Sequence, residues 1–479
     1  MKKGKDIIIW TGIPKRLPQK TIGAYQIAFW LRKNGFTAQV IDHIHNWTKE
    51  EIIQMTEHFI GLETVAIGLS ATFMFTIGET ISRKDSDIPD PAFIEAIHYF
   101  KKKYPRLKFI LGGASVRLDL YEHVDLFDIK LGGFGEESIV KTLTQLKHNG
   151  IFKKSPKIFD IKTSDHKWHV DDVIQPNESL PIEIGRGCIF KCKFCRYRMT
   201  GKAKGSYIRH MDCIREEILD NFYNFKTTSY FLLDDTFNDD ADKIQSWYKM
   251  TQQLPFKIQA TAYTRADLVW SNQETAYMLQ ESGLVSTFLG VESFHSKASV
   301  AVGKGWMGKH GKEWLPYLKS DLWKDKMCIT MGFIIGLPSE DELSIYDSLH
   351  WLIENNINSW RFRTLQITPN ANHYEDISEF ERDITKYGYS FPYPNEPNTW
   401  QSNLMDKNRA DELQDDLLQK SKPYMKHSSW DMIAMKSLGY DIPQVHETYL
   451  KDYDQQQKVS KIEKFLKNYK NLLLSIDVD

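Results

Sequence analysis

Three cysteines, Cys188, Cys192 and Cys195, lie close together in the stretch GRGCIFKCKFC, although the whole chain has only five. Thiolates bind soft metals, and the spacing C-x3-C-x2-C lets one loop wrap around one metal centre. A structural zinc ion needs a fourth ligand, for which His210 is a better candidate than Cys213, because Cys213 follows a predicted helix start. A [4Fe–4S] cluster held by three cysteines instead keeps one iron open to a small molecule.

Charged side chains follow several predicted strands further along the chain. Asp234 and Asp235 lie in LLDDTFND, Arg265 in AYTRADL, and Glu292 in LGVES. Residues at the carboxyl ends of parallel strands face the site of a βα barrel, so these four are candidate site residues. Plainer interpretations are a helix N-cap for the acidic stretch and a surface ion pair with Asp267 for Arg265.

Glycines mark the end of a later predicted strand. The stretch GFIIGLPSE, residues 332–340, has Gly336 two residues before Pro338, which stops the strand. A glycine allows a ligand or another part of the backbone to approach closely. Gly336 is therefore a candidate for a position beside a bound molecule.

The elements that must position these residues form two series of alternating strands and helices. In residues 1–150 the strands are predicted at 6–10, 38–42, 65–70, 108–113 and 128–133, with helices at about 22–34, 49–60, 91–103 and 136–149. Short apolar β-branched runs between amphipathic helices predict βαβ units and a parallel sheet. The glycines just after the strand ends stand where such folds bind ligands.

A polar connection, residues 151–180, leads to the second series in residues 181–370. Its strands are predicted at 181–185, 229–235, 256–263, 285–293, 328–336 and 359–367, with a helix after each of the first five. Six units are fewer than the eight of a full TIM barrel, so we expect a partial (β/α)6 barrel. Residues 371–479 are predicted to be helical, and the last helix, about 455–475, is interpreted as a solvated amphipathic cap.

The cysteine motif with Phe194 before its last cysteine resembles the signature of the radical S-adenosylmethionine (radical SAM) superfamily. The resemblance covers about residues 181–370. It implies that the three cysteines hold a [4Fe–4S] cluster and that the amino and carboxylate groups of SAM bind the open iron. An electron from the reduced cluster then cleaves SAM and yields a 5′-deoxyadenosyl radical. An electron donor such as flavodoxin or ferredoxin is implied as a partner.

The same resemblance implies roles for the strand-end residues. Asp234 and Asp235 resemble the segment that contacts the SAM amino group, in the Asp-Asp form rather than the commoner Gly-Gly-Glu-Pro. Arg265 is assigned to the SAM carboxylate or an acidic substrate, and Glu292 to the SAM ribose or amine. Gly336 lies in a stretch that resembles the family's G-x-I-x-G-x-P motif, which flanks adenine.

Residues 1–150 resemble the Rossmann-like cobalamin-binding domain that precedes many radical SAM domains. The matching stretches contain Ser70 and Thr72 in GLSATF, Gly112 and Gly113 in ILGGAS, and Gly133 in LGGFGEES. The resemblance places the first four beside the nucleotide tail of cobalamin. The D-x-H-x-x-G motif, whose histidine ligates cobalt, is missing. His43 and His45 follow the second strand instead and are interpreted as polar loop residues.

The composition limits the partners and the compartment. The chain has 62 basic and 63 acidic residues, a net charge of −1, which does not call for a nucleic acid or an acidic membrane as partner. The first apolar run ends at Trp10 and is too short for a signal peptide or a membrane span. Clustered cysteines do not resemble a disulfide framework. We therefore expect a cytoplasmic protein with a small-molecule or peptide substrate.

The sequence thus predicts a radical SAM enzyme, with cobalamin-dependent C-methylation of an unactivated carbon as its leading reaction. One alternative is a rearrangement, cyclisation, epimerisation or oxidation that uses no cobalamin. A distant alternative is a zinc-stabilised binding protein. Cys213 is expected to be packed on a helix, and Cys328 to lie in the core of a buried strand rather than to face the barrel and trap a radical.

Overall fold

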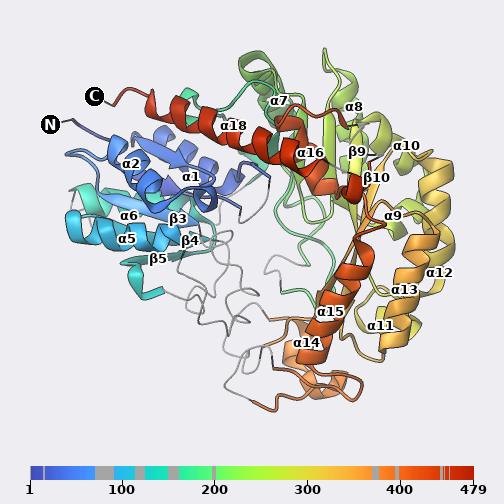
Figure 1. The fold of residues 1–479 in the computed structure, drawn as a ribbon. Helices are drawn as coiled ribbons and strands as arrows, with labels where there is room; N and C mark the ends of the chain where they lie inside the picture. Colours follow the sequence, from blue (N-terminus) through green and yellow to red (C-terminus); the bar gives the residue numbers. More distant parts are fainter. Residues whose placement is uncertain are drawn as a thin grey trace.

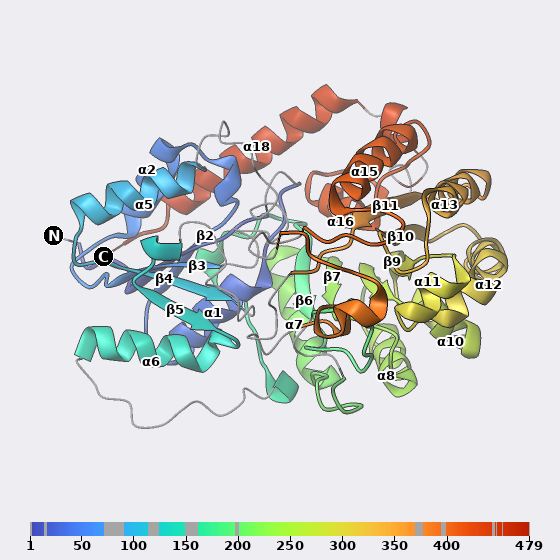
Figure 2. The ribbon, with the colours of Figure 1, turned by 90° about the horizontal axis from the view of Figure 1, so that it is seen from below.

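The computed structural model describes residues 2–13, 17–70, 91–113, 124–148, 161–196, 201–368, 377–393, 399–442, 446, 448–452 and 454–478. Two parallel sheets organise these residues (Figures 1 and 2). Both sheets and most of their helices lie where the sequence predicts them, and the two predicted regions of alternating strands and helices each build one sheet.

The first sheet has five parallel strands in the order β2-β1-β3-β4-β5. They are β1 (Ile7–Trp10), β2 (Ala38–Ile41), β3 (Ala66–Ser70), β4 (Lys108–Gly113) and β5 (Ile129–Gly132). The chain order reverses between β1 and β3, and doubly wound sheets of this order bind ligands at that reversal, outside the carboxyl ends of the strands.

Helices cover both faces of this sheet. Helices α1 (Ile22–Lys33) and α6 (Gly135–His148) pack together, as do α2 (Lys49–Phe59) and α5 (Ala92–Lys103). Successive β1 residues belong to different cores, because Ile7 and Ile9 join one apolar cluster and Ile8 and Trp10 the other. Burial on both faces explains why β1 is continuously apolar rather than alternating.

The second sheet has six parallel strands that follow the chain in the order β11-β10-β9-β8-β7-β6. They are β6 (Leu180–Glu183), β7 (Ser229–Leu233), β8 (Gln259–Thr264), β9 (Leu284–Glu292), β10 (Cys328–Ile335) and β11 (Ser359–Thr364). The helices between them are α7 (Met211–Phe225), α8 (Ala241–Gln252), α9 (Ala266–Ser271), α10 (Glu274–Glu281), α11 (Ser296–Ala301), α12 (Gly305–Tyr317) and α13 (Glu342–Glu354). The six predicted strands form one open sheet in which β6 and β11 are the edges, and their curvature into a partial barrel stays a prediction.

The C-terminal helices connect the two sheets. Helix α14 (Glu379–Arg382) is short, α15 (Lys407–Ser421) packs on β11, and α16 (Ser429–Ser437) packs on β7, β8, β9 and β10. The last helix, α18 (Gln455–Leu474), returns to the first sheet and packs on α2 (Figure 1).

The last helix is amphipathic, as predicted: most of its residues are exposed or half-buried, and one stripe is buried. Tyr469 is fully buried, and its hydroxyl accepts a 2.8 Å hydrogen bond from the backbone N–H of Asp42. Phe465, Leu466 and Leu473 are buried with it. These positions form one apolar stripe at helical spacing, and the first sheet supplies the surface that covers it.

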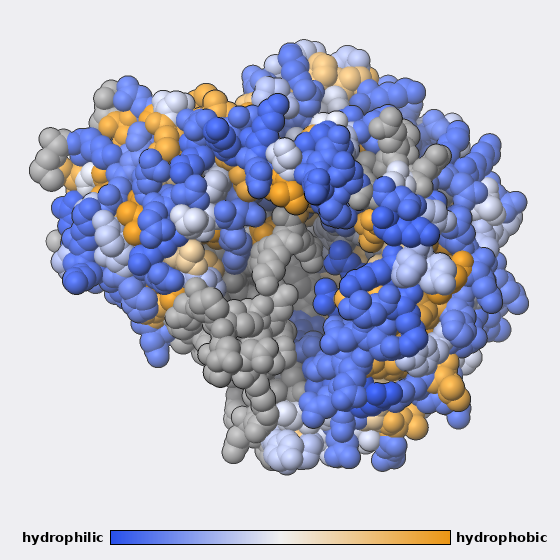
Figure 3. Space-filling model, viewed as in Figure 1, coloured by the Kyte–Doolittle hydropathy of each residue, from blue (hydrophilic) through white to orange (hydrophobic). Residues whose placement is uncertain are grey.

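The described residues on the face shown in Figure 3 are mostly hydrophilic, and their apolar side chains form small separate patches. In the part of the chain that the structure describes, no helix has the length and apolar character needed to span a bilayer.

Candidate active site

The loop after β6 carries the three clustered cysteines, and its glycines are required by close contacts. A Cβ on Gly185 would lie 2.9 Å from a carboxylate oxygen of Asp234. Gly187 has a φ of 113°, and its N–H donates a 3.0 Å hydrogen bond to Asp235 Oδ2. The backbone N–H of Arg186 donates to the carbonyl of Tyr207 at 3.0 Å. The loop is therefore fixed on the carboxyl ends of β6 and β7 before Cys188 begins.

Cys188, Cys192 and Cys195 all line one cavity of about 210 Å³. Cys188 Sγ accepts a 3.4 Å hydrogen bond from the N–H of Phe190 and lies 3.3 Å from the Thr236 hydroxyl. Burial raises the pKa of the Cys188 thiol, and these two contacts oppose that rise. Three sulfur atoms on one wall, with hydrogen-bond donors directed at one of them, are a suitable donor set for a thiolate-bound metal centre.

The other candidate ligands, His210, Cys213 and Cys328, are not among the residues that line the thiol cavity. His210 is exposed and is not among the residues that line the thiol cavity, so the Cys3His zinc site loses its fourth ligand. Within the described residues, no three His, Cys, Asp or Glu side chains, the three loop cysteines included, form a group that could hold a single metal ion, so the donor chemistry of the thiols, and not their spacing in this structure, points to a metal centre. Cys213 is partly buried on α7, and Cys328 is fully buried with its Sγ 3.5 Å from the carbonyl of His427, as expected of packed residues.

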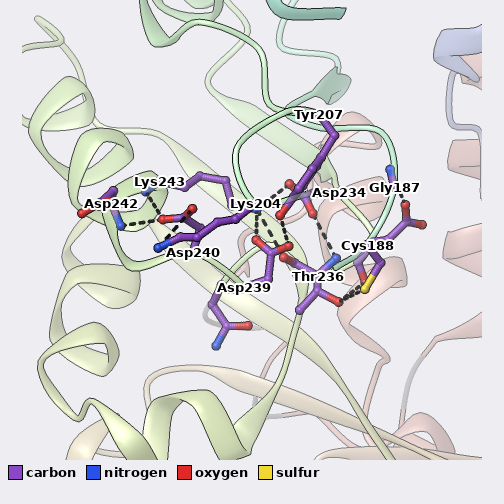
Figure 4. Close-up of polar contacts among 12 residues, drawn as sticks. Gly187, Cys188, Lys204, Tyr207, Asp234, Thr236, Asp239, Asp240, Asp242 and Lys243 are labelled. Carbon is purple, nitrogen blue, oxygen red and sulfur yellow. Dashed lines mark hydrogen bonds and ion pairs between the residues drawn. The ribbon is translucent and has the colours of Figure 1, made fainter. Parts of the chain in front are cut away.

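The two neighbouring aspartates differ in their surroundings, and Figure 4 shows the polar contacts of Asp234. Asp234 is buried, with Oδ1 accepting a 3.0 Å hydrogen bond from the N–H of Thr236 and Oδ2 lying 2.8 Å from the Lys243 ammonium. Asp235 lies on the walls of the thiol cavity and of the larger one described below. Burial, followed by the charge of Asp234, raises the pKa of Asp235 to about 6. Asp234 therefore holds the loop together, and Asp235 is the one that presents its carboxylate to both cavities.

Lys243 forms ion pairs with two carboxylates of the acidic stretch. Its ammonium lies 2.6 Å from Asp239 Oδ1 as well as 2.8 Å from Asp234, and the side chains of all three are fully buried. The Tyr207 hydroxyl donates to the other oxygen of Asp239. The N-cap of α8, which the sequence assigned to Asn238 or Asp239, is Asp240. Its carboxylate accepts hydrogen bonds from the first N–H groups of the helix.

Arg265 lines the thiol cavity and also forms the ion pair with Asp267 that the sequence offered as its plainer role. Its guanidinium reaches Asp267 through two hydrogen bonds of 3.0 and 2.6 Å. Another nitrogen lies 3.8 Å from Cys192 Sγ, and the guanidinium carbon lies 4.0 Å from the ring centroid of Phe190. Asp267 therefore orients a cation beside the sulfur atoms.

Glu292 and Lys304 form an ion pair on the same wall. Lys304 Nζ lies 2.7 Å from Glu292 Oε1 and 2.9 Å from the carbonyl oxygen of Gly290. Glu292 has a left-handed φ of 64°, which turns its side chain into the cavity. Phe194 also lines this cavity. Lys304 follows no strand and carries no signal in the sequence, whereas Thr236 directly follows the aspartate pair and was a predictable neighbour of the site.

Gly336 lies apart from this group and is not among the residues that line the thiol cavity. Its φ is 91°, and a Cβ there would lie 2.3 Å from the Trp400 ring. Its carbonyl accepts a 2.7 Å hydrogen bond from the Tyr389 hydroxyl. The close approach predicted for this glycine is therefore made by a tryptophan of the same chain.

A second and larger cavity of about 360 Å³ lies between the two sheets. The first sheet contributes Ser70, Gly112, Gly113 and Gly133, four of the five residues that the sequence assigned to cobalamin binding, whereas the fifth, Thr72, lies outside the described residues. Most of the other side chains on this side are apolar, namely Ile7, Ile9, Ile22, Ile27, Leu69, Ile110, Leu131 and Ile139. A glycine-lined opening with apolar walls suits a ligand that has apolar surface.

The second sheet closes this cavity with Glu183, Gly185, Arg186, Leu233, Asp234, Asp235 and Tyr263. Asp235 and Tyr263 also line the thiol cavity, so the two cavities adjoin. The ring of Tyr263 is supported by Phe288 and Trp430, at centroid distances of 5.2 and 4.8 Å. A molecule held between the cavities would therefore contact an aromatic ring and a carboxylate.

His43 and His45 do not line either cavity. His43 is buried rather than a solvated loop residue, because the rings of Phe465 and Tyr469 on α18 cover it. Burial lowers the pKa of His43 to about 4. His45 packs edge-on against Phe93.

No family model and no curated protein matches this chain. Solved structures match its fold. The radical S-adenosylmethionine methyltransferase TsrM from Kitasatospora setae, with cobalamin and a [4Fe–4S] cluster bound, superposes with a TM-score of 0.64 at 11% identity, covering 97% of this chain and 99% of that one. The same enzyme with tryptophan substrate and a SAM analogue gives 0.60 at 13% identity, covering 82% and 79%.

The cobalamin-dependent SAM radical enzyme OxsB, with aqua-cobalamin bound, gives a TM-score of 0.60 at 13% identity and covers 98% of this chain and 72% of that one. The chain therefore has the fold of these cobalamin-dependent radical SAM enzymes, across both sheets and the C-terminal helices.

Proposed function

We propose that this protein is a radical SAM enzyme that uses cobalamin to methylate an unactivated carbon of a small molecule or peptide. The observation that carries the proposal is the adjacency of two cavities. Three cysteine thiols share the smaller one with Asp235, Arg265 and Glu292, and the larger one opens beside it between the sheets. The whole-length likeness to TsrM and OxsB supports this combination.

Cys188, Cys192 and Cys195 would hold the [4Fe–4S] cluster. When bound, the cluster supplies the electron that cleaves SAM to a 5′-deoxyadenosyl radical, and cobalamin supplies the methyl group. The chain's own contribution is to place hydrogen-bond donors beside one of the ligands, Cys188. Thr236 and the N–H of Phe190 lie within reach of Cys188 Sγ, and hydrogen bonds to sulfur favour the thiolate and raise the potential of a cluster.

SAM would occupy the remainder of the thiol cavity. Arg265, oriented by Asp267, offers a cation to the SAM carboxylate, and Asp235 offers a carboxylate to its amino group. Glu292, neutralised by Lys304, offers an acceptor to the ribose, and Phe194 provides an apolar wall. Opposite charges on the two sides of the cavity match the opposite charges of an amino acid group.

Cobalamin would occupy the larger cavity, with its nucleotide tail near Ser70, Gly112 and Gly113. The residues that line this cavity among those described include no histidine. The described lining would therefore offer no histidine ligand to cobalamin bound in this cavity.

The substrate would lie where the cavities meet, against Tyr263 and Asp235. A carbon radical reacts with whatever is nearest, so the walls must hold the substrate close and exclude water. The apolar side chains of the first sheet and the ring of Tyr263 are suited to that task.

Corrinoid retention tests the cobalamin part of the proposal. The reconstituted chain is mixed with hydroxocobalamin and desalted, and the bound corrinoid is measured by its visible absorbance. A Cβ at Gly112 would meet only ordinary contacts of 3.9 and 4.0 Å, so Gly112→Ala should retain the corrinoid. Gly112→Leu should lose it, because the longer side chain enters the cavity. If the wild-type chain retains no corrinoid, the methyltransferase proposal is wrong and the cobalamin-independent alternative takes its place.

A further inference from the structure

A partly buried ion-pair triad connects the first sheet to the cysteine loop. Arg186, two residues before Cys188, lies 2.6 Å from Glu136 Oε1 through Nη2. The same guanidinium reaches Glu183 at 2.5 Å through Nε and 3.1 Å through Nη2. Glu136 lies in the first turn of α6, and its side chain is 3% exposed, compared with 13% for Arg186 and for Glu183.

This triad is continuous with the cysteine loop on one side and with the larger cavity on the other. Glu136, Glu183 and Arg186 all line that cavity. The next residue along, Gly187, donates its N–H to Asp235. The ring of Phe134 lies beneath the guanidinium, with its centroid 4.9 Å from the guanidinium carbon. A single cation therefore contacts the turn before α6, the end of β6 and the segment that leads into the cysteines.

We propose that Glu136 is a positioning residue which, through Arg186, fixes the cysteine loop and sets the charge beside the cluster. This inference rests on the proposed function, because the charge effect requires the cluster. One cation and two carboxylates give the triad one net negative charge. An added positive charge near a cluster stabilises its reduced form, and an added negative charge stabilises its oxidised form.

The loop part of the proposal is tested on the full chain without cluster. Glu136→Gln removes one partner of a buried pair, and the matched control is Glu137→Gln, one residue further in the same turn, where the structure gives no ion pair with any described residue. Hydrogen exchange of peptides spanning residues 184–192 is the measurement. Faster exchange in Glu136→Gln, with wild-type exchange in Glu137→Gln, is the expected result. Equal exchange in the two variants overturns this part.

The charge part is tested on the cluster-loaded chain by its midpoint potential. Glu136→Gln should shift the potential upward, Arg186→Gln should shift it downward, and the double variant, which has the wild-type net charge, should return close to the wild-type value. Glu137→Gln should show a smaller shift than Glu136→Gln.

A purely structural role would not produce opposite shifts that cancel. Shifts of the same sign in both single variants, or no shift in Glu136→Gln, overturn the charge part. If the wild-type chain itself takes up no iron, the proposed function fails instead, and the exchange experiment still decides whether Glu136 fixes the loop.

Discussion

Lys243→Met should cost about 3–5 kcal/mol of unfolding free energy, because it leaves two buried carboxylates without their cation. The Lys243 ammonium lies 2.8 Å from Asp234 and 2.6 Å from Asp239, and none of the three side chains is exposed (Figure 4). Methionine matches the length of the lysine stem, so the lost charge rather than a cavity dominates the cost. Urea denaturation of the cluster-free, reduced chain at pH 8 measures the difference.

The matched control is Lys249→Met on the same helix, where the lysine is exposed and the expected change is within about 0.5 kcal/mol. The cost of Lys243→Met should also become smaller as the pH falls toward 5. Burial raises the pKa of Asp239 and the Lys243 ammonium opposes that rise, so without the ammonium the pKa of Asp239 rises further, and the penalty of its charged form is present at high pH and disappears on protonation. A cost equal to that of Lys249→Met, or one that does not decrease with pH, would refute this reasoning.

Two further substitutions test specific contacts. Gly336→Ala should be more destabilising than Gly388→Ala in thermal unfolding. Both residues have a positive φ, which costs about 1–2 kcal/mol for alanine. Only at Gly336 would the new Cβ meet a tryptophan, at 2.3 Å from Trp400, and this overpacking adds about 1–3 kcal/mol. Equal losses would contradict the Trp400 contact. Glu340→Gln should make the free energy of unfolding less dependent on pH. Burial raises the pKa of Glu340 to about 8, so the wild-type chain loses stability as the pH rises from about 4.5 through 8. The glutamine variant lacks that loss. Parallel melting-temperature profiles of the two proteins between pH 5 and 9 would refute the assignment.

The sequence predicts the two sheets because their signals are local. The run IIIW of β1 is apolar throughout, since helices bury both faces of the sheet, and that pattern is visible without any knowledge of its neighbours. The last helix is different. Its apolar stripe around Tyr469 is also visible, but its covering surface lies more than 400 residues earlier in the chain, at Asp42. A pattern alone does not state what covers it.

The sequence predicts those site residues that come directly after a strand. Cys188, Asp235 and Arg265 reach one cavity because parallel strands place their carboxyl ends on the same edge. Asp234 and Asp235 have different roles because Lys243 pairs with Asp234. Lys243 lies nine residues after Asp234 and follows no strand, so the same rule does not identify it. Lys304 was missed for the same reason.

The central claim is that Cys188, Cys192 and Cys195 hold a [4Fe–4S] cluster whose open iron binds SAM. Its most direct measurement is the iron and sulfide content of the anaerobically reconstituted chain, together with the electron paramagnetic resonance spectrum of its reduced form before and after SAM is added. We predict four iron atoms per chain and a SAM-dependent change of spectrum in the wild type and in Cys213→Ala, and the loss of both in Cys192→Ala. A full cluster with an unchanged SAM response in Cys192→Ala would contradict the account.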